Sequence, residues 1–270
     1  MSHAPSPKPR TVQEPATASA LDARAVAADT IAVVVAHGSP SNPEPLDLTL
    51  RALAGDIAVR LSGQVVRGAT LAKPGSLEAA LAARPGEAIR IYPFFMSDGF
   101  FVRRELRRRV AEATSNPVLY TAPFGLDPLL PALCARRARE AAERLGHRAQ
   151  QTVLVLAAHG SRSNPASATA TRVVEGAIRS MAMFADIRSG FVEEAPSIAD
   201  AAAGLAGLPA VCLPLFATSG GHVEDDIPGQ LEAARFAGKL LQPIGEDPAV
   251  PDLIAATLAA AAQAATGREA

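Results

Sequence analysis

Short apolar runs alternate with longer stretches rich in Ala, Leu and Arg along most of the chain. The runs are largely continuous rather than alternately polar, which is typical of strands buried on both faces. The stretches between them are long enough for helices, so successive strands should run parallel in an α/β fold. Eight strands are predicted, at 31–36, 64–69, 88–95, 117–124, 152–158, 186–191, 210–216 and 239–244.

The second four strands repeat the first four. VVVAHGS at 33–39 matches VLVLAAHGS at 153–161, PFFMSDGFFV at 93–102 matches PLFATSGGHV at 214–223, and GLDPLLP at 125–131 matches GEDPAVP at 245–251. Agreement at this many separate places indicates an internal duplication. We therefore expect two similar α/β domains, at 30–146 and 147–270, related by a pseudo-twofold axis and linked by a helix at 132–145.

Composition narrows the classes of function. The 270 residues are 49% hydrophobic and 20% charged, with a formal net charge of −1, so nothing draws the whole chain to nucleic acid or to an anionic membrane. No apolar run approaches the roughly 18 residues that a membrane span needs. Residues 1–29 are rich in Pro, Ala, Ser and Thr, lack the apolar segment of a secretory signal, and are expected to form a disordered tail. These features predict a cytoplasmic protein.

The two cysteines, Cys134 and Cys212, lack the paired spacing of a zinc or iron–sulfur site. Unpaired cysteines of this kind are usually small buried hydrophobes. Any metal ion should therefore be bound by nitrogen and oxygen ligands.

Histidines and acids follow the predicted strands of the second half. His159 follows its first strand and His222 its third, while Glu193 and Glu194 come directly after the second. Because the carboxyl ends of parallel strands meet at one edge, where ligands bind, these side chains should lie together. Adjacent residues on an extended chain face opposite ways, so only one of the two glutamates should point inward.

The first half keeps only part of this set. His37 matches His159, but Phe101 stands where the second half has His222, and Leu71-Ala72 replaces the acidic pair. The candidate site therefore belongs to the second half. His37 is then either a vestige or a secondary metal contact.

Two charged clusters each allow two interpretations. Glu224, Asp225 and Asp226 fit the first turn of a helix, where the dipole favours acids, or a supply route for a divalent cation. The arginines from 103 to 109 fit a solvated helix face or a surface that attracts a polyanionic substrate. Neither a G-x-S-x-G nucleophile elbow nor a phosphate-binding loop is present.

Three strings, AHGSR at 158–162, FVEEAPSI at 191–198 and PLFATSGGHVEDDIP at 214–228, together resemble the class II tetrapyrrole chelatases of the CbiX/SirB group. This resemblance implies two tandem flavodoxin-like (chelatase-like) domains with parallel sheets. It also implies a sirohydrochlorin chelatase, a lyase that inserts Co²⁺ or Fe²⁺ in cobalamin or sirohaem biosynthesis. No cofactor beyond the substrate metal is expected.

The resemblance assigns roles to residues. His159 and His222 match the active-site histidines and Glu193 or Glu194 the acid between them, so His159, His222 and Glu193 are the expected metal ligands. The polycarboxylate macrocycle should be bound by charge-assisted donors and by backbone that permits close approach. The expected contacts are Ser161, Arg162, Gly220, Gly221, Arg103 and Arg104. The first half should close the cleft and hold the edge of the macrocycle.

Other interpretations remain open at this point. Loss of half the ancestral constellation also fits a catalytically degenerate carrier or partner protein that binds metal or tetrapyrrole without turnover. A hydrolase or nucleotide-binding domain has only the fold in its favour. The duplication supplies within one chain two halves that could otherwise come from two subunits, so a monomer is expected.

Overall fold

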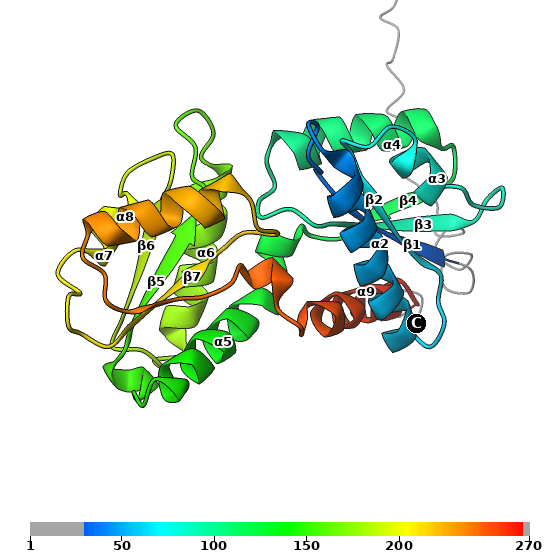
Figure 1. Ribbon diagram of the computed structural model, residues 1–270. Helices are drawn as coiled ribbons and strands as arrows, with labels where there is room; N and C mark the ends of the chain where they lie inside the picture. The colour runs from blue at the N-terminus through cyan, green and yellow to red at the C-terminus, as the bar shows by residue number, and fades with distance from the viewer. Residues whose placement is uncertain (1–29, 267–270) are drawn as a thin grey trace, which may run out of the picture.

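The computed structural model describes residues 30–266, which form two α/β halves lying side by side, one for each copy of the repeat (Figure 1). The expected tail, residues 1–29, lies outside the described residues. Each half holds a four-stranded sheet in which all pairings are parallel. The predicted fold class, two tandem α/β units with parallel sheets, is confirmed.

The two sheets have the same strand order. The first is ordered β2-β1-β3-β4, with β1 (Thr30–Ala36), β2 (Val66–Thr70), β3 (Ala88–Pro93) and β4 (Val118–Tyr120). The second is ordered β6-β5-β7-β8, with β5 (Val153–Ala158), β6 (Asp186–Phe191), β7 (Ala210–Pro214) and β8 (Lys239–Leu240). The central strands β3, β5 and β7 are buried along their whole length, as helices on both faces require.

The edge strands β4 and β8 are shorter than predicted. The apolar runs continue to residues 124 and 244, but Pro123 and Pro243 interrupt them, and short 3₁₀ turns follow at Phe124–Leu126 and Ile244–Glu246. Proline cannot donate a backbone hydrogen bond to a neighbouring strand, so pairing ends before it.

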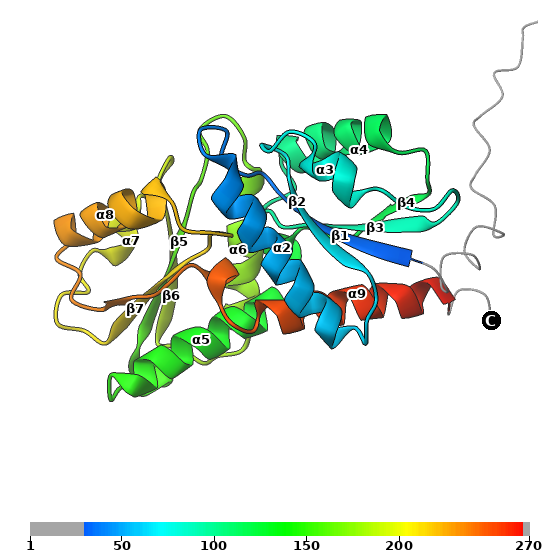
Figure 2. The same ribbon diagram turned by 45° about the vertical axis from the view of Figure 1, so that its right-hand side comes forward.

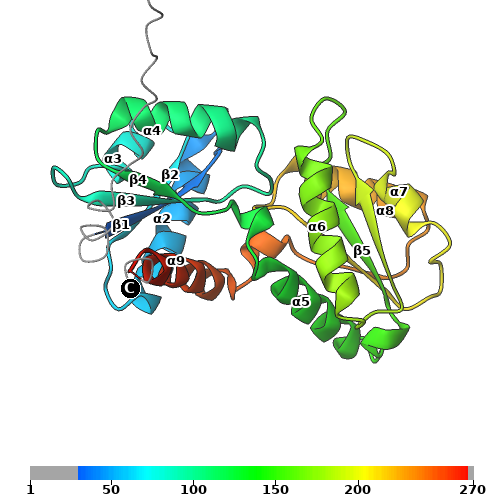
Figure 3. The ribbon, with the colours of Figure 1, turned by 180° about the vertical axis from the view of Figure 1, so that it is seen from behind.

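Helices cover both faces of each sheet (Figures 1 and 3). The first half of the sequence contributes α2 (Pro43–Arg60), α3 (Ser76–Ala80), α4 (Arg107–Ala113) and α5 (Leu130–Arg144). The second half contributes α6 (Ala166–Ser180), α7 (Ile198–Ala202), α8 (Ile227–Ala233) and α9 (Val250–Thr266). Two π-helical turns, η1 (Phe101–Leu106) and η4 (His222–Asp226), lead into α4 and α8. No helix within residues 30–266 is long and apolar enough to cross a bilayer.

Each half ends with a helix that packs on the other half. Helix α5, expected to link the domains, packs against α6 and β7, and the C-terminal helix α9 returns to α2 (Figures 1 and 2). Arg60 of α2 forms an ion pair with Asp252 of α9. A single apolar core consequently extends through both halves, including Val34 and Leu258 on one side and Leu133 and Leu213 on the other.

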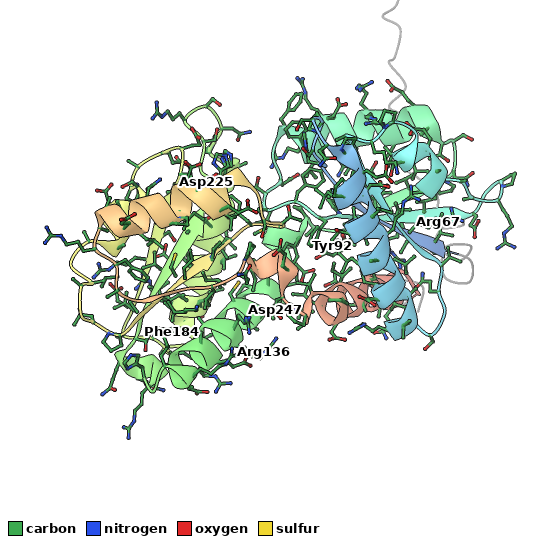
Figure 4. All side chains as sticks on the ribbon, viewed as in Figure 1. Arg67, Tyr92, Arg136, Phe184, Asp225 and Asp247 are labelled. Atoms are coloured by element: carbon green, nitrogen blue, oxygen red, sulfur yellow. The ribbon has the colours of Figure 1, made fainter. Side chains whose placement is uncertain are left out.

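Two equivalent buried aspartates, Asp127 and Asp247, bind the helices α9 and α5 that each half receives from the other; we call these two the exchanged helices. Asp127 accepts hydrogen bonds from the hydroxyls of Tyr92, at 2.9 Å, and of Thr257 on α9, at 2.7 Å. Its counterpart Asp247 pairs with Arg137 on α5 at 3.1 Å, and Figure 4 shows Asp247 beside the neighbouring Arg136. The exchange thus joins the two halves by polar contacts as well as by the core.

Candidate functional site

The expected histidines meet at the carboxyl edge of the second sheet. His159 follows β5, and His222 is the first residue of η4, which follows β7. Their ring centroids lie 4.7 Å apart, with the planes at 88°. The ring of Phe216 lies 6.5 Å from each. Two imidazoles that are separated in the sequence by α6, β6, α7 and β7 therefore lie together at the carboxyl edge of the sheet.

Each ring is held by its Nδ1 atom. His222 Nδ1 donates to the Asp226 carboxylate at 2.6 Å, and His159 Nδ1 donates to the carbonyl oxygen of Gly160 at 2.7 Å. Both acceptors require a proton on Nδ1, so in the neutral imidazoles the lone pair is on Nε2. This tautomer leaves two Nε2 atoms free to bind a cation or to accept protons.

The loop after β5 requires glycine at position 160. Gly160 has φ +71°, and a Cβ there would lie 2.8 Å from Phe191 Cβ and 2.9 Å from the Glu194 carboxylate. The carboxylate lies this close because it accepts a hydrogen bond from the backbone N–H of Ser161 at 2.9 Å. Of the two glutamates, Glu194 thus supports the His159 loop. That role depends on the folded loop and has no sequence signal.

Glu193 is joined to the His159 loop through its backbone. Its backbone N–H donates to the His159 carbonyl and its own carbonyl accepts from Arg162 at 3.1 Å, but the residue is exposed. Residues 30–266 contain no group of three or more His, Cys, Asp or Glu side chains placed to hold a metal ion, so the structure brings together two of the three expected ligands, His159 and His222. The metal-binding role of Glu193 stays a prediction.

The first half reproduces the geometry of the pair with a different ring. His37 and Phe101 have centroids 4.2 Å apart and planes at 83°, and His37 Nδ1 donates to the Gly38 carbonyl at 2.8 Å. Phe101 begins η1 as His222 begins η4. The first half therefore keeps the scaffold of a histidine pair but supplies only one imidazole.

Two adjoining cavities lie between the halves beside these rings. One, of about 360 Å³, is lined by His159, Ser161 and Phe216 from the second half and by Phe100 and Phe101 from the first. The next, of about 540 Å³, is lined by residues of both halves, including Phe100, Arg103, Arg104 and Asn164. The expected cleft between the halves is therefore present next to the histidines.

Some of the arginines from 103 to 109 form a solvated helix face, and others line the second cavity, where they could attract a polyanionic substrate. Arg108 is paired with Glu105 and Glu112, both at 2.8 Å, and Arg107 lies over the ring of Tyr120. These belong to a solvated helix face. Arg103 pairs with Asp98 at 2.9 Å, whereas the Arg104 guanidinium has no hydrogen bond or ion pair with residues 30–266. Arg104 is thus the cation free to bind an anionic group at the cavity.

Gly220 and Gly221 are exposed ahead of His222. A Cβ at Gly220 would meet nothing within 4 Å, and one at Gly221 would meet only Asp225, at 3.9 Å. The folded chain does not itself require glycine at either position, which agrees with the expectation that they leave room for a ligand. Figure 4 shows Asp225 at the same end of the second half.

Asp226 differs from the two acids beside it. Glu224, Asp225 and Asp226 together fit either helix-start acids or a supply route for a cation, yet among them it is Asp226 that holds the His222 ring. The spacing of His222 and Asp226 is the sequence signal for this contact, because residues four apart on a helix are neighbours.

Both cysteines are fully buried as expected, and burial raises the pKa of the Cys212 thiol to about 12.

Comparison with known proteins gives a consistent result. The family model described as CbiX matches the chain twice, over residues 32–141 and 153–261. A Halobacterium salinarum protein named "Probable sirohydrochlorin cobaltochelatase" is 25% identical over 226 residues, which cover 73% of this chain and 74% of the relative. A solved structure described as CbiX, the terminal enzyme for biosynthesis of siroheme in denitrifying bacteria, is 44% identical, with TM-score 0.75, covering 85% of this chain and 98% of that chain. SirB from Bacillus subtilis with Fe³⁺, at 16% identity and TM-score 0.72 over 88% of this chain and 98% of that chain, shares the fold.

Proposed function

The chain belongs to the CbiX family, and on that basis we propose that it inserts a divalent metal ion into sirohydrochlorin. The observation that carries this proposal is the 4.7 Å pair of His159 and His222 rings beside a cavity that both halves line. Imidazole nitrogen is a good ligand for Fe²⁺ and Co²⁺, the two cations considered for this reaction.

In the first step, the two Nε2 atoms hold the incoming cation. Metal–imidazole bonds are about 2.1 Å long, and with the ring centroids 4.7 Å apart both Nε2 atoms can reach one ion that lies to the side of the line between the rings. With only two protein ligands, the remaining positions are left to water and to the macrocycle. A site of low coordination releases its metal readily, as a transferring site must.

In the second step, the cation moves to the pyrrole nitrogens and their two N–H protons leave. Each Nε2 atom that the metal vacates can accept one proton, so the charge balances within the site. The Asp226 carboxylate stabilises the resulting imidazolium of His222. We assign Glu193, exposed at the same strand end, to relaying protons to solvent.

Single substitutions test the pair. His159→Ala and His222→Ala should each abolish metal insertion. The assay follows insertion as the decrease in absorption of metal-free sirohydrochlorin, so this absorption should persist in both variants. His37→Ala, which changes the same motif in the first half, should keep most of the activity. Full activity in His222→Ala would refute the assignment.

The same assay separates the enzyme from a carrier. A carrier would bind sirohydrochlorin and cation without metallating the macrocycle, whereas an enzyme converts it over many turnovers. We also propose that the metal is Fe²⁺. The solved structure of an enzyme of siroheme biosynthesis is 44% identical to this chain, whereas the probable cobaltochelatase is only 25% identical. A higher kcat/KM with Co²⁺ than with Fe²⁺ would contradict this choice.

Arg104 is proposed to bind a carboxylate of the macrocycle, joined by Arg103 when it leaves Asp98. Arg104→Gln should raise the KM for sirohydrochlorin and leave kcat nearly unchanged, since the contact is the same before and during metal transfer. Arg108→Gln is the matched control, because Arg108 is on the same helical segment but already paired with two glutamates. Equal effects of the two substitutions would reject the role.

A further inference from the structure

The two π-helical turns occupy equivalent places in the repeat but carry opposite chemistry. Gly221-His222 and Glu224-Asp225 of the second half correspond to Phe100-Phe101 and Arg103-Arg104 of the first. One turn presents imidazole and carboxylates, which attract a cation. The other presents aromatic rings, against which a flat ring system can stack, and guanidinium groups, which attract carboxylates.

The two phenylalanines of the first half are unusually exposed for their size. Phe100 is 54% and Phe101 44% exposed, although both line the cavity that His159 also lines. A phenylalanine buries a large apolar area when covered, so leaving two adjacent rings open to water forgoes stabilisation. Exposed apolar patches mark contact sites for other molecules, and this one lines a cavity of a size that suits a small-molecule ligand.

Positively charged side chains lie next to the two phenylalanines on the side of the second cavity. Phe100 borders the second cavity, whose lining includes the unpaired Arg104. A larger cavity, of about 800 Å³, lies between α2 and residues 217–220, but its charged residues are Asp56, Glu246, Asp247 and Arg60. Arg60 is already paired with Asp252, so that cavity repels a polycarboxylate.

We propose that Phe100 and Phe101 form the surface on which the macrocycle of sirohydrochlorin stacks, with Arg104 fixing a carboxylate at its rim. This proposal rests on the proposed function and names the residues that select its organic substrate. The first half then binds the macrocycle, and the second half delivers the cation from His159 and His222. Phe101 thus replaces a metal ligand with a substrate contact.

Binding of metal-free sirohydrochlorin, measured by fluorescence quenching without any cation, tests the stacking. Phe100→Ala and Phe101→Ala should each weaken binding about tenfold, the scale of an aromatic contact together with its buried area. Phe100→Trp keeps a planar ring and should bind within a few-fold of the natural protein, whereas Phe100→Leu keeps apolar bulk without a ring and should bind like the alanine variant. Leu119→Ala is the control, since Leu119 is 41% exposed on the edge strand β4 of the same half.

The outcomes separate this proposal from the proposed function. The His159→Ala and His222→Ala proteins should bind the macrocycle normally while failing to metallate it, and the phenylalanine variants should bind Co²⁺ normally when it is supplied alone. Natural-strength macrocycle binding by Phe100→Ala, Phe101→Ala or Phe100→Leu would overturn the stacking surface and leave the chelatase proposal intact. A natural protein that does not bind sirohydrochlorin at all would overturn both.

Discussion

At the scale of single residues, position 101 and its counterpart 222 separate the two halves chemically. The backbone, the π-helical turn and the partner histidine are equivalent, and the rings meet at 4.2 Å in one half and 4.7 Å in the other. His37 already has its Nδ1 atom bound to the Gly38 carbonyl, so its Nε2 is available. What the first half lacks is a second imidazole.

Restoring that imidazole should create a second metal site. Phe101→His is expected to raise the Co²⁺ bound per chain from one to two, measured by equilibrium dialysis. The new site should be about 10–100-fold weaker than the natural one, because Glu105, which corresponds to Asp226, is held by Arg108 and is not free to orient the new ring. Phe101→Leu serves as the control, and unchanged stoichiometry in Phe101→His would show that the first half has lost the scaffold as well as the ligand.

Asp226 gives a second prediction at this scale. Asp226→Ala removes the acceptor that holds His222 Nδ1, so Co²⁺ affinity should fall about 10–100-fold. Asp225→Ala removes an adjacent exposed carboxylate that does not hold the ring, and it should change the affinity little. Isothermal titration of both variants decides whether orientation of the ring, rather than local negative charge, sets the affinity.

At the scale of elements, a buried carboxylate joins α2, β2 and α3 where the second half carries its acidic pair. Asp47 is fully buried and accepts hydrogen bonds from Ser76, Thr70 and Lys73, with Arg51 at 2.9 Å. Burial raises the pKa of Asp47, but the bonds from Ser76 and Lys73 and the two positive charges together hold it below its ordinary value. The first half thus has a buried structural carboxylate beside the loop after β2.

This cluster should make stability depend on pH in a defined direction. A carboxyl whose pKa is lowered by folding stabilises the protein above its unfolded pKa of about 3.9, and that contribution is lost as pH falls through the folded value. Asp47→Asn should therefore lower the free energy of unfolding by about 1–3 kcal/mol near neutral pH and flatten its decline in acid. Asp56→Asn, exposed on the same helix, is the control; urea unfolding between about pH 3 and pH 7 measures both.

At the scale of the whole molecule, the exchange of α5 and α9 determines how the halves depend on each other. Leu133 on α5 and Leu253 on α9 are equivalent in the repeat, and each is 7% exposed in the continuous core. Each helix nevertheless packs on the half that does not contain it in sequence. A substitution that removes apolar side-chain volume from one of these helices should consequently lower the local stability of the opposite half.

Equivalent substitutions make this testable by hydrogen exchange. Leu253→Ala and Leu133→Ala should each cost about 2–5 kcal/mol as buried leucines. Leu253→Ala should reduce amide protection chiefly in β1–β3 and α2, and Leu133→Ala chiefly in β5–β7 and α6. Loss of protection in the half that carries the substitution would contradict the exchange.

The sequence by itself determined much of this protein, for reasons that are local or repetitive. Continuous apolar runs located the strands, because a strand buried on both faces needs no polar residues. Aligning the repeat with itself identified His159 and His222, because parallel strands end at one edge. The prolines that shorten β4 and β8 are also visible in the sequence, but the apolar runs around them predict longer strands.

Only the tertiary structure decided the rest. Whether α5 covers its own sheet or its neighbour's depends on contacts between halves whose apolar faces are nearly equivalent, so no local pattern distinguishes the two. The path of the backbone after β6 leaves Glu193 exposed and brings the Glu194 carboxylate to the backbone of the His159 loop. Side-chain direction at a strand end is a property of the folded loop, and for that reason the sequence located the histidine pair but not the carboxylates around it.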